Sequence, residues 1–134
     1  MPRVRMIIAR LIGVLALSSP GGAGAADGLK RIKGDVYRFQ NRFHFNMVVM
    51  TDAGVVVTDP INADAAARLK GEIAKLTDKP ITHLIYSHSH GDHASGGSAF
   101  GAVPNIIAHA NAPADIDGVK PTLRFSDEMT LEVG

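Results

Sequence analysis

A cluster of side chains that can bind metal occupies one short segment of the chain. Residues 88–93 contain the pattern His-x-His-x-Asp-His. Alternate residues of an extended segment point to one side, so His88 and His90 can present their imidazoles to one metal ion. The glycine that follows permits a sharp turn, which redirects Asp92 and His93 toward a second, adjacent ion. Imidazole suits zinc, and a carboxylate can bind the metal or orient its water.

The alternative interpretation of these residues is a solvated loop. A single loop histidine is usually hydrogen-bonded or exposed, but three histidines and an aspartate within six residues are costly to desolvate together without a metal. Ser87 and Ser89 are candidate nucleophiles by residue type alone. No G-x-S-x-G elbow surrounds them, so we interpret them as hydrogen-bonding loop residues.

The elements around this segment indicate a layered α/β (α+β) fold. Residues 81–86 form an apolar, β-branched strand, as expected where helices cover a sheet, and ligand sites open where the chain leaves such strands. Asn62 is a predicted N-cap with Asp64 in the first turn of a helix that ends at residues 77–80. The apolar stripe of this helix consists of Ala66, Leu69, Ile73 and Leu76. Further strands are predicted at residues 36–39, 43–50, 55–58 and 105–108, with turns at 40–42 and 52–54.

Composition limits the classes of protein. The chain has 134 residues, 46% of them apolar and 20% charged, which is enough for one domain with a core. It contains no cysteine, which excludes disulfides, a thiolate metal site and a cysteine nucleophile. Without the first 25 residues, 11 basic and 13 acidic residues leave a net charge of −2. This balance gives no reason to expect a nucleic-acid partner.

Residues 1–25 have the pattern of a signal peptide. Three arginines precede a short apolar run (residues 11–17), and Ala23-Gly24-Ala25 matches the small-x-small site of signal peptidase, so we predict cleavage before Ala26. The alternative, a membrane anchor, requires about 20 apolar residues, and this run is shorter. We therefore expect a periplasmic or secreted protein without a stable membrane anchor.

Residues 82–93 closely resemble the signature of the metallo-β-lactamase superfamily of zinc hydrolases. Residues 46–60 resemble the second and third strands of that family, Gly96 and Gly97 match the small residues that begin its next helix, and residues 106–109 are similar to its next strand and turn. The resemblance implies a four-layer αβ/βα sandwich with a zinc site along one edge.

The resemblance also implies roles for individual residues. His88 and His90 would bind a first zinc, and Asp92 and His93 a second. Zinc-bound hydroxide would attack an ester, thioester, amide or sulfate/phosphate ester of a small-molecule substrate, with Asp92 as the catalytic residue that orients the water. Asp59 would fix the metal loop through hydrogen bonds. One or two ions are implied, and iron or manganese replaces zinc in some relatives.

The further metal ligands of this family lie beyond the residues present here. We therefore expect residues 26–134 to be a metallo-β-lactamase-like domain truncated on its C-terminal side, covering about the first αβ half. Residues 122–134 resemble the strand pair before the family's third histidine. Two other hypotheses remain: a catalytically inactive fragment or zinc-binding remnant, and half of a split enzyme. An uncovered apolar sheet face would then favour self-pairing or a complementing chain.

The remaining histidines and aromatic residues have less specific interpretations. His44 is either a substrate contact or a half-exposed strand residue, and alternation along the strand favours the second. His109 is interpreted as a hydrogen-bonding turn residue. The aromatic residues Tyr37, Phe39, Phe43 and Phe45 are interpreted as sheet packing.

Overall fold

A computed structural model describes residues 4–9 and 27–134 of the protein. The predicted signal peptide lies largely outside these residues, as does its predicted cleavage site before Ala26. Its described part, Val4–Ala9, forms strand β1. Within the described ranges, no helix has the length and apolar character needed to cross a membrane.

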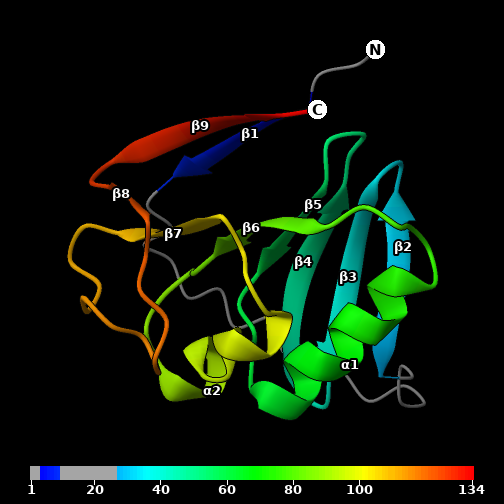
Figure 1. The fold of residues 1–134 in the computed structure, drawn as a ribbon, viewed down its shortest axis with the longest axis horizontal. Helices are drawn as coiled ribbons and strands as arrows, with labels where there is room; N and C mark the ends of the chain where they lie inside the picture. Colours follow the sequence, from blue (N-terminus) through cyan, green and yellow to red (C-terminus); the bar gives the residue numbers. More distant parts are fainter. Residues whose placement is uncertain (1–3, 10–26) are drawn as a thin grey trace, which may run out of the picture.

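A seven-stranded mixed sheet organises the protein (Figure 1), with its strands in sequence order from β2 to β8. The first four strands pair antiparallel, and β5 to β8 pair parallel. The strands are β2 (Gly28–Lys33), β3 (Val36–Asn41), β4 (His44–Met50), β5 (Val55–Thr58), β6 (Ile81–Ile85), β7 (Asn105–His109) and β8 (Leu123–Phe125). This confirms the predicted α+β class and each of the predicted strands.

Helix α1 (Ala63–Ala74) connects β5 to β6 and packs on one face of the sheet. Its predicted cap is present, because the Asn62 side chain accepts a hydrogen bond from the Ala65 backbone N–H at 2.8 Å. The predicted apolar stripe is buried only as far as Ile73. Leu76 lies beyond the end of the helix and is 56% exposed, so its assignment to the stripe was wrong.

Two short helices complete this face: α2 (Gly91–Ala94) and the 3-10 helix η1 (Gly97–Phe100). Gly96 begins η1 with φ +78°, and a Cβ at this position would overlap the backbone nitrogen of Ala63. Only glycine combines this conformation with so close an approach. The main hydrophobic core lies between these helices and the sheet, and includes Phe39, Val57, Leu69, Leu84 and Ala108.

The opposite face of the sheet is covered in part, where we expected it to be uncovered. Strand β9 (Glu128–Val133) pairs antiparallel with β1 in a second sheet. Its apolar side chains pack over a second cluster, formed by Val49, Val56, Ile85, Ile107 and Val133. The expected strand pair in residues 122–134 is also corrected, because β8 belongs to the large sheet and β9 to the small one. Apolar side chains outside this cover remain exposed, among them Val36, Phe45, Met47 and Leu123.

Candidate metal centre

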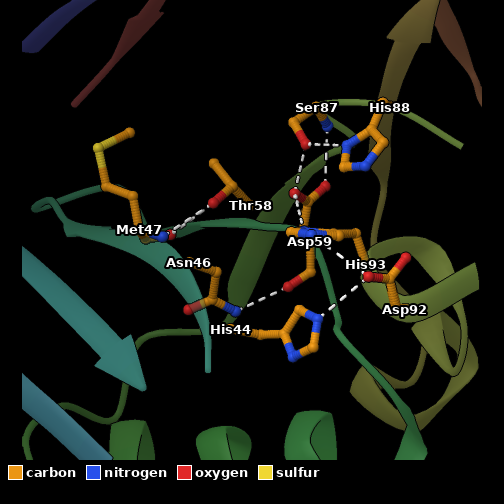
Figure 2. A network of polar contacts seen from close by, with 9 residues as sticks. All are labelled: His44, Asn46, Met47, Thr58, Asp59, Ser87, His88, Asp92 and His93. Atoms are coloured by element: carbon orange, nitrogen blue, oxygen red, sulfur yellow. Dashed lines mark hydrogen bonds and ion pairs between the residues drawn. The ribbon is translucent and has the colours of Figure 1, made fainter. Parts of the chain in front are cut away.

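The candidate site lies where three strands meet at one edge of the sheet (Figure 2). Asp59 follows β5, and the His-rich segment follows β6. Because β5 and β6 are parallel, with Thr58 opposite Ile85, their carboxyl ends reach the same edge. Strand β4 runs antiparallel to β5, so its first residue, His44, also lies at this edge. Pairing of the strands therefore assembles residues that are up to 49 positions apart.

Asp59 is the buried anchor of the metal loop. Its Oδ1 accepts a hydrogen bond from the Ser87 backbone N–H at 2.8 Å, and its Oδ2 accepts one from the Ser87 hydroxyl at 2.5 Å. Its backbone carbonyl accepts a bond from the Asn46 side chain at 2.7 Å. Burial raises the pKa of Asp59, and the bonds from Ser87 oppose that rise. These contacts agree with the predicted roles of Asp59 and Ser87.

The contact between Ser87 and His88 fixes the tautomer of that histidine. The Ser87 Oγ lies 2.8 Å from His88 Nδ1, and the hydroxyl proton is already donated to Asp59. His88 Nδ1 must therefore carry the proton and donate it to Ser87. The other ring nitrogen, Nε2, is left with its lone pair available to a metal ion.

His93 faces Asp59 directly, on the same carboxylate oxygen that accepts the Ser87 hydroxyl. Its Nδ1 lies 3.6 Å from Asp59 Oδ2, and its Nε2 lies 3.8 Å from Asp92 Oδ2. The Nδ1 atom is buried without a hydrogen-bond partner. A buried carboxylate behind Nδ1 with Nε2 facing outward is the arrangement of a metal-ligating histidine. The donor set therefore fits a divalent metal.

The rings of His88 and His90 lie close together on the exposed side of the loop. Their centroids are 4.9 Å apart, and those of His88 and His93 are 4.4 Å apart. Two groups of three side chains have their ligand atoms within 4.8 Å of one another: Asp59, His88 and His93, and His44, Asp92 and His93. His90 belongs to neither group, although it immediately precedes α2 and adjoins His88.

Asp92, in α2, is exposed and contacts a residue of strand β4. Its Oδ2 accepts a hydrogen bond from His44 Nε2 at 3.1 Å. This hydrogen bond lowers the pKa of Asp92, so the carboxylate is ionised at neutral pH. Sequence patterns did not identify this contact, because alternation along the strand defines the face of His44 but not its neighbours across the sheet.

A polar depression of about 550 Å³ lies beside His44. Asn41, Arg42, Asn62 and Asp64 line it together with His44. A second depression, of about 390 Å³, is lined by residues from the C-terminal part of α1 and contains none of the candidate ligands. The first depression is therefore the one adjacent to the candidate centre.

The other predicted roles have mixed outcomes. His109 is hydrogen-bonded as expected, with Nε2 donating to the Ser126 carbonyl at 2.7 Å. Phe39 is fully buried in the core, and Tyr37 packs against it. Phe43, at the turn between β3 and β4, is 90% exposed, so its interpretation as sheet packing was wrong. Phe45 is also exposed, with the Arg38 guanidinium 4.9 Å from its ring centroid.

The helix-covered mixed sheet and the histidine-rich loop at its edge define the fold of a metallohydrolase. The sequence model of the Metallo-beta-lactamase superfamily matches residues 41–125, which include all of the candidate ligands. The chain belongs to the metallo-beta-lactamase superfamily. No curated protein sequence matches it significantly.

Solved structures have the same fold. A metallo-beta-lactamase from Novosphingobium pentaromativorans superimposes with a TM-score of 0.63 and 26% identity, over 75% of this chain and 45% of that one. A metallo-beta-lactamase in complex with mercaptoacetic acid superimposes with a TM-score of 0.59 and 20% identity, over 72% of this chain and 39% of that one. A stereoselective inverting sec-alkylsulfatase from a Pseudomonas species superimposes with a TM-score of 0.56 and 23% identity, over 63% of this chain and 15% of that one. The chain thus spans less than half the length of each structure.

Proposed function

We propose that this protein is a zinc-dependent hydrolase of the metallo-beta-lactamase superfamily. The observation that carries the proposal is the convergence of His88, His90, Asp92 and His93 at one sheet edge, behind which Asp59 is buried. In this proposal His88 and His90 hold one ion, and Asp92 and His93 hold another. The fixed Nδ1 proton of His88 and the Asp59 carboxylate behind His93 support it.

A bound divalent ion would lower the pKa of a water molecule to about 7 and polarise the oxygen of the bond to be cleaved. The remaining chemistry belongs to the side chains of this chain. Asp92 supplies an ionised carboxylate that can accept a proton or orient the attacking water. Asp59, held by Ser87, keeps the loop in the conformation that directs His88 and His93 toward the ion.

A small molecule with an ester, thioester, amide or sulfate/phosphate ester group is the proposed class of substrate. The polar depression beside His44 supports a small substrate, since His44 hydrogen-bonds to Asp92. The matched structures include beta-lactamases and an alkylsulfatase, whose names imply different scissile bonds. Because one fold carries several such chemistries, a panel of substrates is required.

Export to the periplasm or outside the cell is a second part of the proposal. It is supported by the arginines, apolar run and Ala23-Gly24-Ala25 site of the first 25 residues. Expression of the full chain in a Gram-negative host, followed by fractionation and N-terminal sequencing, tests it. A mature N-terminus at Ala26 in the periplasmic fraction is expected, and an intact chain retained in the cytoplasm would contradict export.

Association through the part of the second sheet face that β9 leaves exposed is the third part. Exposed apolar side chains there, including Phe45 and Met47, are of the type that pairs with a second copy or a complementing chain. Sedimentation velocity of the full chain and of Met47→Lys tests self-pairing. Dimer that is lost in the variant is expected, and a wild-type monomer at high concentration would exclude self-pairing.

The decisive experiment for the hydrolase combines metal content with activity. Zinc, iron and manganese are measured by elemental analysis in the purified chain and in a His88→Ala/His90→Ala variant. Hydrolysis of a chromogenic cephalosporin, p-nitrophenyl acetate and p-nitrophenyl sulfate is measured on the same samples. Zinc and hydrolysis that disappear together in the variant are expected.

Two results would contradict this proposal in different ways. A chain that holds zinc but cleaves none of the substrates would favour a zinc-binding remnant or half of a split enzyme. A folded chain without metal would remove the basis for a metallohydrolase.

A further inference from the structure

His44 is the candidate ligand that the metal motif does not contain. It begins β4 directly after the hairpin turn, in which Arg42 has φ +54°. The β3–β4 hairpin and the pairing of β4 with β5 bring it to the same edge as the metal loop. Figure 2 shows its ring directed toward Asp92, which lies 48 positions further along the chain.

The separations between the donor atoms match those required by one metal ion. Ligands about 2.0–2.2 Å from a tetrahedral zinc ion are about 3.3 Å from one another. His44 Nε2 lies 3.1 Å from Asp92 Oδ2, and His93 Nε2 lies 3.8 Å from the same oxygen. The His44 and His93 rings meet edge to face with centroids 5.1 Å apart, so neither ring blocks the other.

We propose that His44, Asp92 and His93 together bind one divalent metal ion, with zinc as the ion that this donor set favours. The inference rests on the proposed metal centre and adds a third ligand to it. Two imidazoles and one carboxylate are a common set for a catalytic ion with an open coordination position. With His44, the chain itself supplies the three protein ligands that such an ion requires.

The other three-residue group is a weaker candidate. It contains Asp59, both of whose carboxylate oxygens already accept hydrogen bonds from Ser87. Asp59 is also only 4% exposed, whereas the side chain of Asp92 is 61% exposed and free to approach an ion. His93 therefore directs Nε2 to the ion and keeps Nδ1 toward Asp59.

A hydrogen bond between His44 and Asp92 without a metal role is the competing explanation. The variant His44→Gln distinguishes a metal ligand from a simple hydrogen-bond donor, because glutamine can donate to Asp92 but is a poor zinc ligand. His83→Gln is the matched control, since His83 belongs to neither three-residue group and its ring hydrogen-bonds to the neighbouring Thr82. Circular dichroism establishes that each variant is folded.

The test is zinc titration of the full chain, monitored through the ring nitrogens of ¹⁵N-labelled histidines. We expect the Nε2 signal of His44 to shift on zinc binding, together with that of His93. We expect the apparent zinc Kd to rise at least about tenfold in His44→Gln and to stay unchanged in His83→Gln.

Each other result has a defined meaning. If the other histidines of the loop shift while His44 does not, or if His44→Gln binds as tightly as the wild type, the third-ligand proposal is wrong and the hydrolase proposal stands. If no histidine shifts at saturating zinc, both proposals fail.

Discussion

The two faces of the seven-stranded sheet are buried in different ways. On one face, α1, α2 and η1 cover a large core that includes fully buried side chains such as Val57 and Leu69. On the other, Val133 of β9 packs on four buried residues of the large sheet, and Phe45 and Met47 outside this smaller cluster are exposed. The candidate ligands lie at the sheet edge, on the loop after β6, in α2 and at the start of β4. We therefore expect the helix-covered face to contribute more to stability than the face that β9 covers.

The largest expected effect is at Gly96, where the metal loop packs against the start of α1. In Gly96→Ala, the new methyl group would overlap the backbone of Ala63, and alanine would have to adopt φ +78°. We expect the free energy of unfolding to fall by about 4 kcal/mol, measured by urea denaturation. Gly118→Ala is the control, because Gly118 has φ +80° with nothing within 4 Å and should lose only about 1 kcal/mol. Equal losses would mean that packing at Gly96 contributes little.

Substitution of two neighbouring valines of β5 allows a direct comparison of how firmly each face is packed. Val57 and Val56 are 0% and 1% exposed, and they point to the helix-covered and β9-covered faces respectively. We expect Val57→Ala to lower the free energy of unfolding by about 2.5 kcal/mol and Val56→Ala by about 1 kcal/mol, because β9 can move into the space. Denaturation of both variants measures this. Equal costs would show that β9 covers its face as firmly as the helices cover theirs.

Titration of Tyr86 tests how well the helix-covered face excludes water from its core. Burial raises the pKa of Tyr86 to about 12, and the charge of Asp59 contributes to the rise. The buried ring is accommodated in its neutral form. The part of the free energy of unfolding that depends on this neutral form is therefore complete below pH 10.0 and is lost as pH rises through about 12. We expect a phenolate step near that pH in the ultraviolet absorbance, which is absent in Tyr86→Phe. A wild-type protein in which Tyr86 ionises near pH 10.0 would contradict the burial.

Loss of the tyrosine hydroxyl itself should cost little. Its oxygen is buried without a hydrogen-bond partner, so Tyr86→Phe removes a polar group that gains nothing from folding. We expect the free energy of unfolding to stay equal or to rise by up to about 1 kcal/mol. A marked loss would indicate a partner for this hydroxyl, such as an ordered water molecule.

The smallest expected effect is on the exposed part of the second face. Met47 is 37% exposed, and its side chain lies outside the cluster beneath β9. We therefore expect Met47→Lys to change the free energy of unfolding by less than about 0.5 kcal/mol, measured in dilute solution. A larger loss would place Met47 in a buried interface and would support pairing of this face.

Local patterns predicted most of the strands and the main helix. The cap at Asn62 and the buried positions of α1 followed from residue type and helical spacing, because both depend on neighbours within a few positions. The strand predicted over residues 81–86 is present at Ile81–Ile85. The role of Asp59 came instead from the family resemblance. The assignment of Leu76 to the apolar stripe failed because spacing alone does not show that the helix ends at Ala74.

Contacts between distant segments could not be predicted in the same way. The hydrogen bond between His44 and Asp92 depends on the register of β4 against β5 and on the turn at Gly91. The cover provided by β9 depends on contacts of Val133 with residues as distant in the sequence as Val49. Neither is encoded in a short pattern, because side-chain alternation defines a face but not the partner that covers it.

The bonds of Asp59 have a consequence for how the protein folds. Its carboxylate holds Ser87, 28 positions away, and its backbone holds Asn46 from another strand. Such contacts form only after β4, β5 and β6 have come together, since closing long loops delays nonlocal contacts. We therefore expect the ligands to acquire their arrangement late in folding, after the transition state. Added zinc should therefore slow unfolding while leaving the rate of refolding nearly unchanged.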